Sequence, residues 1–230
     1  MAGRRAFRVL AVVAGLLVVA LVAVTAVGFS LVRRPLPAHD GATRLVGLDA
    51  EVRVLRDERG VPSIYADTPE DLFRAQGFVD AQDRFFLMDL RRHVTAGRLA
   101  ELVGGDETAI ASDTMVRTLG WRRVASAEWA ELDSATRDYL QAYAAGGIAS
   151  LGRRDGDSLG VEYTILGTQV QVSQPEPWDP VDSLTWLKAM AWDLRGNDRE
   201  ELARVHTYQV VRDVALTEQL FPRWSASAPI

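Results

Sequence analysis

The chain has 230 residues, of which 48% are hydrophobic and 25% are charged, and this balance excludes a disordered tail. It contains no cysteine, so these residues encode neither a disulfide framework, nor a thiol nucleophile, nor a cysteine-ligated zinc site. The formal net charge of -5 gives no support to a general binder of phosphate backbones, and we do not expect nucleic acid as a partner.

An uncharged, apolar stretch covers residues 9–32, with three arginines before it and two after it. Its 24 residues exceed the roughly 20 that a membrane-spanning helix needs and the roughly 7–15 of a signal-peptide core. A buried helix of a soluble protein would show a polar face, which this stretch lacks. We therefore expect residues 1–35 to form a retained single-pass signal anchor in the cell membrane, with the folded part outside the cytoplasm. The small residues Ala26-Val27-Gly28 leave cleavage, and hence secretion, as the alternative.

Residues 36–44 contain one proline, one glycine and His39, and we expect them to be a short tether with His39 in solvent. The folded part should then cover residues 45–230.

The folded part should begin with a β-hairpin. Residues 46–56 and 61–66 contain alternating and β-branched apolar side chains, and Asp57–Gly60 between them is a turn candidate in which Gly60 can adopt a positive φ. Pro62 lacks a backbone donor, which places its strand at an edge or makes Pro62 one of its first residues.

Three helices are predicted next. Thr68-Pro69 combines a capping hydroxyl with proline at the first helical position, and the helix that starts there should end before Gly104-Gly105. The second helix covers about Asp113–Glu131. The third begins at the cap candidate Ser134 and runs toward Gly146-Gly147.

The last third of the chain mixes loops and helix. A loop is expected near Arg153–Gly160, a strand or extended segment at Val161–Leu166, and another loop at Gln174–Trp178. Asp179-Pro180 starts a further helix by the same cap-and-proline pattern, and its apolar residues keep helical spacing.

Common catalytic motifs are absent from the sequence. It contains no nucleophile elbow, no phosphate-binding glycine loop, no dinucleotide fingerprint and no zinc-protease motif. His39, His93 and His206 are widely separated and show no ligand spacing. The acidic clusters Asp80/Asp83 and Asp198/Glu200/Glu201 could supply general acids, metal ligands or solvated helix charges, and spacing alone favours solvated charges.

The segment from Asp57 to about Val103 carries the most specific signal. It contains, in this order, G-V-P-x-I-x-A, D-L-F-x-A-x-G-F, A-Q-D-R, an Arg-Arg pair and G-R-L-A-E-L-x-G. In content and order these motifs resemble the penicillin acylase (penicillin amidase) family of N-terminal-nucleophile hydrolases. Further matching segments extend the resemblance over roughly residues 45–230: L-G-W at 119–121, V-E-Y at 161–163, E-P-W at 176–178, M-A-W-D-L-R-G-N at 190–197 and L-F-P at 220–222.

The resemblance implies an amide hydrolase that is made as one precursor (a zymogen), which cuts itself into a smaller α chain and a larger β chain. The family's nucleophile is the serine at the new β N-terminus, whose α-amino group has a pKa near 8 and acts as general base. No Gly-Ser-Asn-x-Trp-like junction occurs in this sequence, and Ser225 and Ser227 do not form one. The nucleophile is therefore expected on sequence beyond this chain, which alone should be inactive and has no catalytic residue of its own.

Met190 and Leu194 match the positions of the family's hydrophobic acyl-pocket residues, and at i, i+4 on one helix they would face the same way. Ordinary core packing is the alternative for each. Asn197 and Glu201 would continue this stripe at i+7 and i+11.

Calcium-containing members of the family use one α-chain glutamate as a ligand. Glu201 precedes an aliphatic residue as that glutamate does, whereas an ungapped count selects Glu200. Because calcium needs six to eight oxygen ligands, the β chain would have to supply the others, and a solvated charge is the alternative. No organic cofactor is expected. Asp83, Arg84, Arg91 and Arg92 are interpreted as structural pairing groups.

The resemblance implies a fold that is mostly α with short β strands. It would be the α-subunit part of an αββα N-terminal-nucleophile hydrolase, preceded by one transmembrane helix. The expected function is the α-chain portion of an exported, autoprocessed amidase that acts on a small acylated amine: a β-lactam side chain, an acyl-homoserine lactone or an acyl peptide. Its partners would be the β chain of the same precursor and the membrane. The alternative is a non-catalytic, membrane-anchored envelope binding module or a truncated pseudoenzyme.

Overall fold

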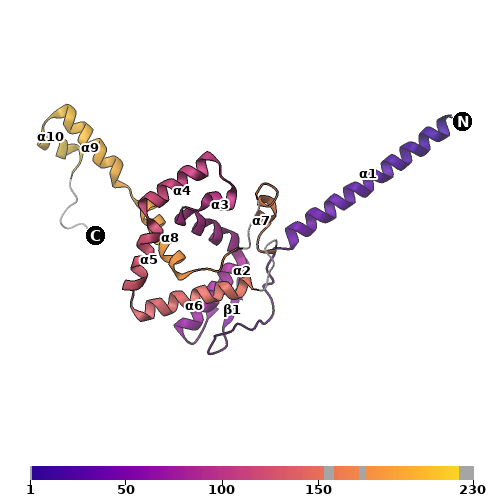
Figure 1. Cartoon of the computed structure of the whole chain (residues 1–230), viewed down its shortest axis with the longest axis horizontal. Coiled ribbons are helices and arrows are strands. Elements are labelled where there is room, and N and C mark those ends of the chain that lie inside the picture. The colour runs from indigo at the N-terminus through magenta and orange to yellow at the C-terminus, as the bar shows by residue number, and fades with distance from the viewer. Residues whose placement is uncertain (1, 153–157, 171–174, 223–230) are drawn as a thin grey trace. The chain divides into compact units, whose positions relative to one another are not determined.

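The computed structural model describes residues 2–152, 158–170 and 175–222, and these ranges are mostly helical (Figure 1). The predictions for the loop at 153–157, for Gln174 and for Ser225 and Ser227 lie outside the described residues. The chain divides into two compact units, Met1–Lys188 and Ala189–Ile230, with the division inside helix α8.

The apolar N-terminal stretch forms helix α1, Ala2–Arg33. Its section Leu10–Arg33 is long and apolar enough to cross a membrane, a criterion that a signal sequence would also meet. The hydroxyl of Thr25 donates to the carbonyl oxygen of Leu21 at 2.8 Å, so this polar group is satisfied inside the helix. The helix is as predicted, and its retention in a membrane stays a prediction.

The predicted hairpin is present as the antiparallel strands β1 (Arg53–Arg56) and β2 (Pro62–Tyr65), with Arg53 opposite Tyr65. Gly60 has φ 79° in the turn, and Pro62 is the first residue of its strand, where no ladder donor is lost. Strand β1 is shorter than predicted, because only the residues that face β2 pair with it.

Helix α2, Pro69–Ala96, starts as predicted, with the Thr68 hydroxyl accepting from the Asp71 amide at 3.2 Å. It ends earlier than predicted, because Gly97 adopts φ 68° and caps it. A separate helix, α3 (Leu99–Val103), covers the remaining residues before Gly104. Inside α2, Arg84 has φ -150° and ψ 37°, which interrupts the helical backbone.

The second predicted helix is two helices, α4 (Glu107–Leu119) and α5 (Trp121–Glu131), because Gly120 takes φ 73° between them. Helix α6 (Ser134–Leu151) is capped by Asp133 rather than by the predicted Ser134. The Asp133 carboxylate accepts from the Thr136 amide at 3.0 Å.

The strand predicted at Val161–Leu166 is wrong: these residues form the short helix α7. Six residues, two of them polar, are too few for periodicity to separate strand from helix, and tertiary packing decides here. The Tyr163 ring is buried and meets Phe86 edge to face at 5.1 Å.

Helix α8, Pro180–Leu194, starts as predicted. The Asp179 carboxylate accepts from the Val181 amide at 2.8 Å, and Asp182 accepts from the Asp179 amide at 3.0 Å. Helices α9 (Asn197–Val211) and α10 (Val214–Leu220) follow it, joined by a turn in which Arg212 has φ 51°.

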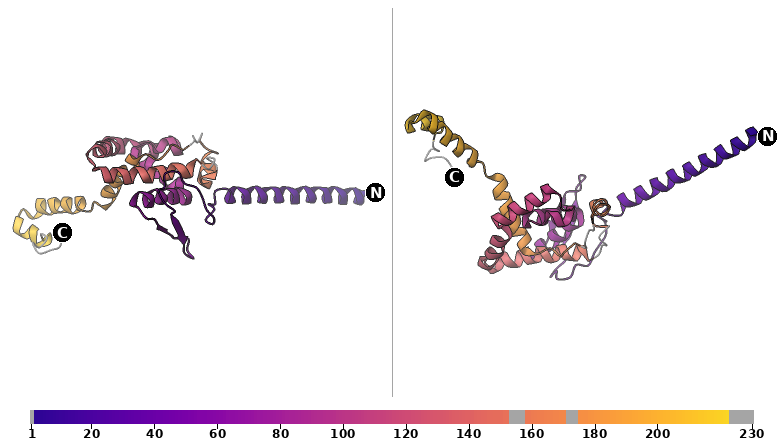
Figure 2. Two further views of the ribbon diagram at one scale, coloured as in Figure 1. Left: turned by 90° about the horizontal axis from the view of Figure 1, so that it is seen from below. Right: turned by 45° about the horizontal axis from the view of Figure 1, so that its top comes forward.

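The core of the first unit lies where α2 packs along α6 (Figure 2). Two buried glycines, Gly77 on α2 and Gly146 on α6, allow the two backbones to come close. A Cβ on Gly77 would lie 2.0 Å from the Tyr143 carbonyl oxygen, and one on Gly146 would lie 1.9 Å from that of Arg74. Around this contact, α2, α3, α6, α7 and the segments before α7 and α8 contribute the core side chains Ala81, Phe85, Met88, Leu102, Ala144, Leu159, Tyr163 and Trp178.

A Gly146→Ala substitution should therefore destabilise the chain by roughly 1–3 kcal/mol or more, because the added methyl overlaps backbone that cannot move alone. Gly147→Ala is the matched control, since its Cβ would meet no atom closer than 3.8 Å and alanine favours the helix. Urea unfolding followed by circular dichroism measures both. Equal stability of the two variants would contradict the close packing of α2 on α6.

Candidate functional site

A chain of buried charges fixes the start of α8, the helix that carries the predicted pocket residues. Arg92 on α2 donates from Nε to Asp89 Oδ1 at 2.7 Å and from Nη1 to the carbonyl oxygen of Pro177 at 2.9 Å. The same Nη1 lies 3.9 Å from Asp182 Oδ2, and Arg122 of α5 donates to the other oxygen of Asp182. Asp89, Arg92 and Asp182 are all buried, so each charge depends on the others for compensation.

Asp89 is the centre of this network. Its Oδ2 accepts from the Tyr163 hydroxyl at 2.7 Å, and its Oδ1 lies 3.2 Å from Nδ1 of His93. Burial alone would raise the pKa of Asp89, but the contacts with His93, Arg92 and Tyr163 outweigh it and lower that pKa. Burial likewise opposes the charged form of His93, whereas its hydrogen bonds with Asp89 raise its pKa above the ordinary value.

The acidic pair Asp80/Asp83 is also structural. The Tyr143 hydroxyl donates to Asp80 Oδ2 at 3.0 Å. Burial is the main cause that raises the pKa of Asp80 and that of Tyr143. Arg56 of β1 donates to both carboxylate oxygens of Asp83, at 2.8 and 2.9 Å. Within residues 2–152, 158–170 and 175–222, neither carboxylate is arranged as a general acid beside a nucleophile.

The predicted pairing arginines occupy different environments. Arg91 lies over the Trp186 ring at 4.4 Å, which adds a cation–π contact between α2 and α8. Arg92 belongs to the buried network, and Arg84 is exposed at the interruption of α2.

Met190 and Leu194 lie one turn apart on the last part of α8, with exposed fractions of 38% and 76%. Leu194 is therefore not a core residue of the described chain. Two exposed apolar side chains at i, i+4 form a surface that another chain or an apolar ligand can cover.

The predicted continuation of this stripe is wrong. Helix α8 ends at Leu194, and Gly196 (φ -130°, ψ -12°) separates it from α9, so the spacing from Met190 to Asn197 and Glu201 is not that of one helix. Glu200 and Glu201 are exposed near the start of α9. Among the residues that the structure describes, no three His, Cys, Asp or Glu side chains cluster as a metal site, so a calcium ion would need oxygen ligands from elsewhere.

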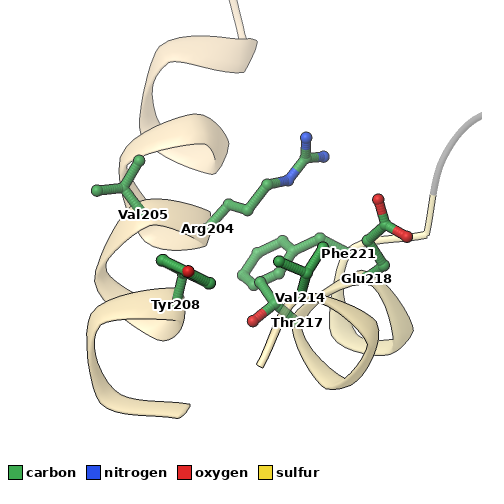
Figure 3. Close-up of a pocket in the computed structure, with 7 residues that line it drawn as sticks. All are labelled: Arg204, Val205, Tyr208, Val214, Thr217, Glu218 and Phe221. Carbon is green, nitrogen blue, oxygen red and sulfur yellow. The ribbon is translucent and has the colours of Figure 1, made fainter. Parts of the chain in front are cut away.

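The sequence did not reveal a hollow between α9 and α10, with a volume of about 340 Å³ (Figure 3). The turn at Arg212 brings α9 and α10, the two walls of the hollow, together. The spacing of apolar residues along one helix could therefore not have predicted the hollow. Arg204 lies over the Phe221 ring at 5.9 Å on one side of this hollow. Its lining residues are Arg204, Val205, Tyr208, Val214, Thr217, Glu218 and Phe221.

The second unit leaves much of its apolar surface exposed. Helix α9 buries none of its described side chains, and Leu202, Val205 and Val210 are more than half exposed. A surface of this kind is typical of a segment that packs against a partner.

Three comparisons place these features among known proteins. The profile of the family described as penicillin amidase matches residues 51–228. The chain is 40% identical over 155 residues to penicillin acylase 2 proenzyme of Pseudomonas sp. (strain SE83). The aligned region covers 67% of this chain and 19% of that protein. It is 31% identical over 176 residues to acyl-homoserine lactone acylase QuiP of Pseudomonas aeruginosa. That aligned region covers 76% of this chain and 20% of the relative.

The structure agrees with the sequence comparisons. It matches the thermostable penicillin G acylase from Alcaligenes faecalis with a TM-score of 0.59 and 29% identity, over 78% of this chain and 95% of the matched chain. The present chain spans about a fifth of the length of the curated relatives that it matches.

The His93–Asp89 contact should make stability depend on pH. Unfolded histidine titrates near pH 6.5, and His93 has a raised pKa when folded, so its stabilisation is full below about pH 6.5 and is lost as pH rises through the folded pKa. The free-energy difference between the wild type and His93→Gln should shrink from about pH 6 to about pH 9. Urea unfolding across this range measures it, with His206→Gln on the exposed face of α9 as control. A difference that stays constant with pH would contradict the assigned contact.

Proposed function

The chain belongs to the penicillin amidase family, and we propose that it is the α part of an amidase that hydrolyses linear amide bonds of N-acylated substrates. The match of the family profile to residues 51–228 carries this proposal. Its relatives are named as acylases of penicillin and of acyl-homoserine lactones, so the substrate class is a small acylated amine.

The reaction needs a nucleophile that this sequence does not contain. In the proposed enzyme, a serine at the N-terminus of a β chain attacks the amide carbonyl, and its own α-amino group takes the hydroxyl proton and later protonates the leaving amine. Water then hydrolyses the acyl-enzyme. The name proenzyme, which one relative carries, supports a precursor that is cut to expose such a residue. Without its β chain, the chain would be inactive.

The contribution of this chain is a wall of the acyl pocket. Met190 and Leu194 are apolar, exposed and one turn apart, which suits contact with an acyl chain at a surface shared with the β chain. Methionine is flexible and adapts to varied acyl shapes. The exposed apolar side chains of α9 would pack against the β chain as well.

Helix α1 would hold the enzyme at the outer face of the cell membrane as a retained anchor. Its section Leu10–Arg33 has the length and composition of a spanning helix, and the arginines before it favour a cytoplasmic N-terminus.

A calcium ion would have a structural role at the α–β contact. Glu201, or Glu200 beside it, would supply one carboxylate, a hard oxygen ligand of the kind calcium prefers. Both side chains are exposed, which suits a site completed by another chain.

The proposal is tested on the complete reading frame that contains these 230 residues. We expect its product to be cut in two and to release primary amine from penicillin G, an acyl-homoserine lactone or an acyl peptide. A complete product without a serine-led second chain and without amine release would favour a non-catalytic binding module of the cell envelope.

In the intact enzyme, Met190→Trp should narrow acyl-chain tolerance, because the larger ring occupies pocket volume. The ratio of kcat/KM for long over short acyl chains should fall about tenfold, as expected for a few displaced methylenes. Met115→Trp is a matched control, since this methionine is 43% exposed on α4. If Met190→Trp leaves the preference for acyl-chain length unchanged, the assignment of Met190 to the pocket wall is contradicted.

For calcium, a chelator should lower the melting temperature of the intact enzyme, because an ion that binds only the folded state stabilises it. Glu201→Gln should lower the melting temperature and abolish the effect of the chelator, while Glu200→Gln should behave as wild type. The opposite pattern would assign the ligand to Glu200. Bound metal is measured by elemental analysis, and a metal-free wild type would reject the site.

A further inference from the structure

Four titratable side chains are buried together where α2 meets the start of α8: Asp89, Arg92, His93 and Asp182, each at most 8% exposed. Two of them are acids, and Arg92 is a cation at every relevant pH. The set is therefore neutral when His93 carries a proton and has one net negative charge when His93 is neutral. Because an uncompensated buried charge is costly, the proton on His93 affects every member of the set.

The contacts divide between Asp89 on one side of Arg92 and the start of α8 on the other. Arg92 Nε donates to Asp89 Oδ1 at 2.7 Å, and Arg92 Nη2 lies 2.6 Å from the same oxygen. Nδ1 of His93 lies 3.2 Å from this oxygen and 2.8 Å from the backbone oxygen of Asp89. Arg92 Nη1 donates to the Pro177 carbonyl at 2.9 Å and lies 3.9 Å from Asp182 Oδ2.

The charged and titratable groups on the surrounding elements bind other partners. His93 lies in the last turn of α2, where the helix dipole favours a cation. The surrounding groups are Glu176 and Arg98, which bind each other, Asp113 and Arg117 of α4, which bind backbone atoms of residues 97–100, Arg122 of α5, which donates to Asp182, and Tyr163 of α7, which donates to Asp89.

We propose that His93 is a pH-sensitive switch that controls how firmly the start of α8 is bound to α2. When His93 is protonated, Asp89 has two cations beside it, and Arg92 also binds the start of α8. When the proton leaves to solvent, Arg92 alone compensates Asp89 and is drawn toward it. Its hydrogen bond to the Pro177 carbonyl and its attraction to Asp182 then weaken, so the start of α8 loosens.

The pH at which the switch acts follows from the same contacts. The hydrogen bonds with Asp89 raise the pKa of His93 above its ordinary value of about 6.5, against the effect of burial. The start of α8 is therefore expected to be firmly bound in mildly acidic solution and to loosen in mildly alkaline solution. The switch lies within the first unit and needs no β chain.

Hydrogen exchange of the full chain in detergent tests the switch. After correction for the intrinsic effect of pH, the amides of residues 179–185 should exchange about tenfold faster at about pH 9 than at about pH 6, because a hydrogen bond to a charged group has weakened. The amides of α6 are the internal reference, since no α6 residue belongs to the buried set. Equal protection of residues 179–185 at both pH values, or the same change in α6, would overturn the proposal.

His93→Gln should exchange fast at both pH values, because glutamine donates a hydrogen bond but carries no charge. His39→Gln is the matched control: Nε2 of His39 lies 3.4 Å from Asp83 Oδ1, but its side chain is 43% exposed. This control should keep the pH dependence of the wild type. If His93→Gln keeps it as well, another group titrates and the proposal fails.

A second readout does not require His93→Gln to fold. The chain has three histidines, so in His39→Gln/His206→Gln the imidazole signal in the NMR spectrum belongs to His93 and gives its pKa. The exchange of residues 179–185 in this variant should change with the same midpoint. Separate midpoints would contradict the link between His93 and the start of α8.

Discussion

The pairing of Asp89 with Arg92 within α2 is the interaction on which the arrangement of the first unit depends. Through it α2 binds α7 by the Tyr163 hydroxyl, the loop before α8 by the Pro177 carbonyl, and α8 itself by Asp182. Arg122 brings α5 to the same carboxylate. Because Asp89, Arg92 and Asp182 are buried, removing one of them would leave another charge uncompensated, so the network defines one arrangement of these helices rather than several. The same network holds the first residues of α8 within the first unit.

The second unit has apolar side chains that no other described residues of the chain bury. Helix α9 buries no side chain, and Leu194 is 76% exposed. Isolated exposed leucines are normal on protein surfaces, but a helix that buries none of its apolar residues gains little stability alone. The chain spans about a fifth of the length of its curated relatives, and in the proposed enzyme this surface would contact the β chain.

Several elements could be predicted from the sequence because their signals are local. Thr68-Pro69 and Asp179-Pro180 start helices, and Gly60 permits the hairpin turn, by capping and backbone preferences that need no tertiary contact. One error arose where a distant contact decides: Tyr163 draws Val161–Leu166 into a helix by packing in the core. The early end of α2 and the division between α4 and α5 depend instead on the positive φ of Gly97 and Gly120. The roles of Met190, Leu194, Glu200 and Glu201 came from family resemblance alone, because local helical patterns do not mark a surface that a second chain would complete. The hollow between α9 and α10 depends on the turn at Arg212, which no helical pattern reveals.

The central claim is that this chain forms one enzyme with a second chain of the same precursor. The most direct measurement is native mass spectrometry of the protein isolated in mild detergent from the cells that make it. The account predicts a complex of this chain with one larger chain whose first residue is serine, both encoded by one reading frame. A chain recovered as a stable soluble monomer, or bound only to products of other genes, would contradict it.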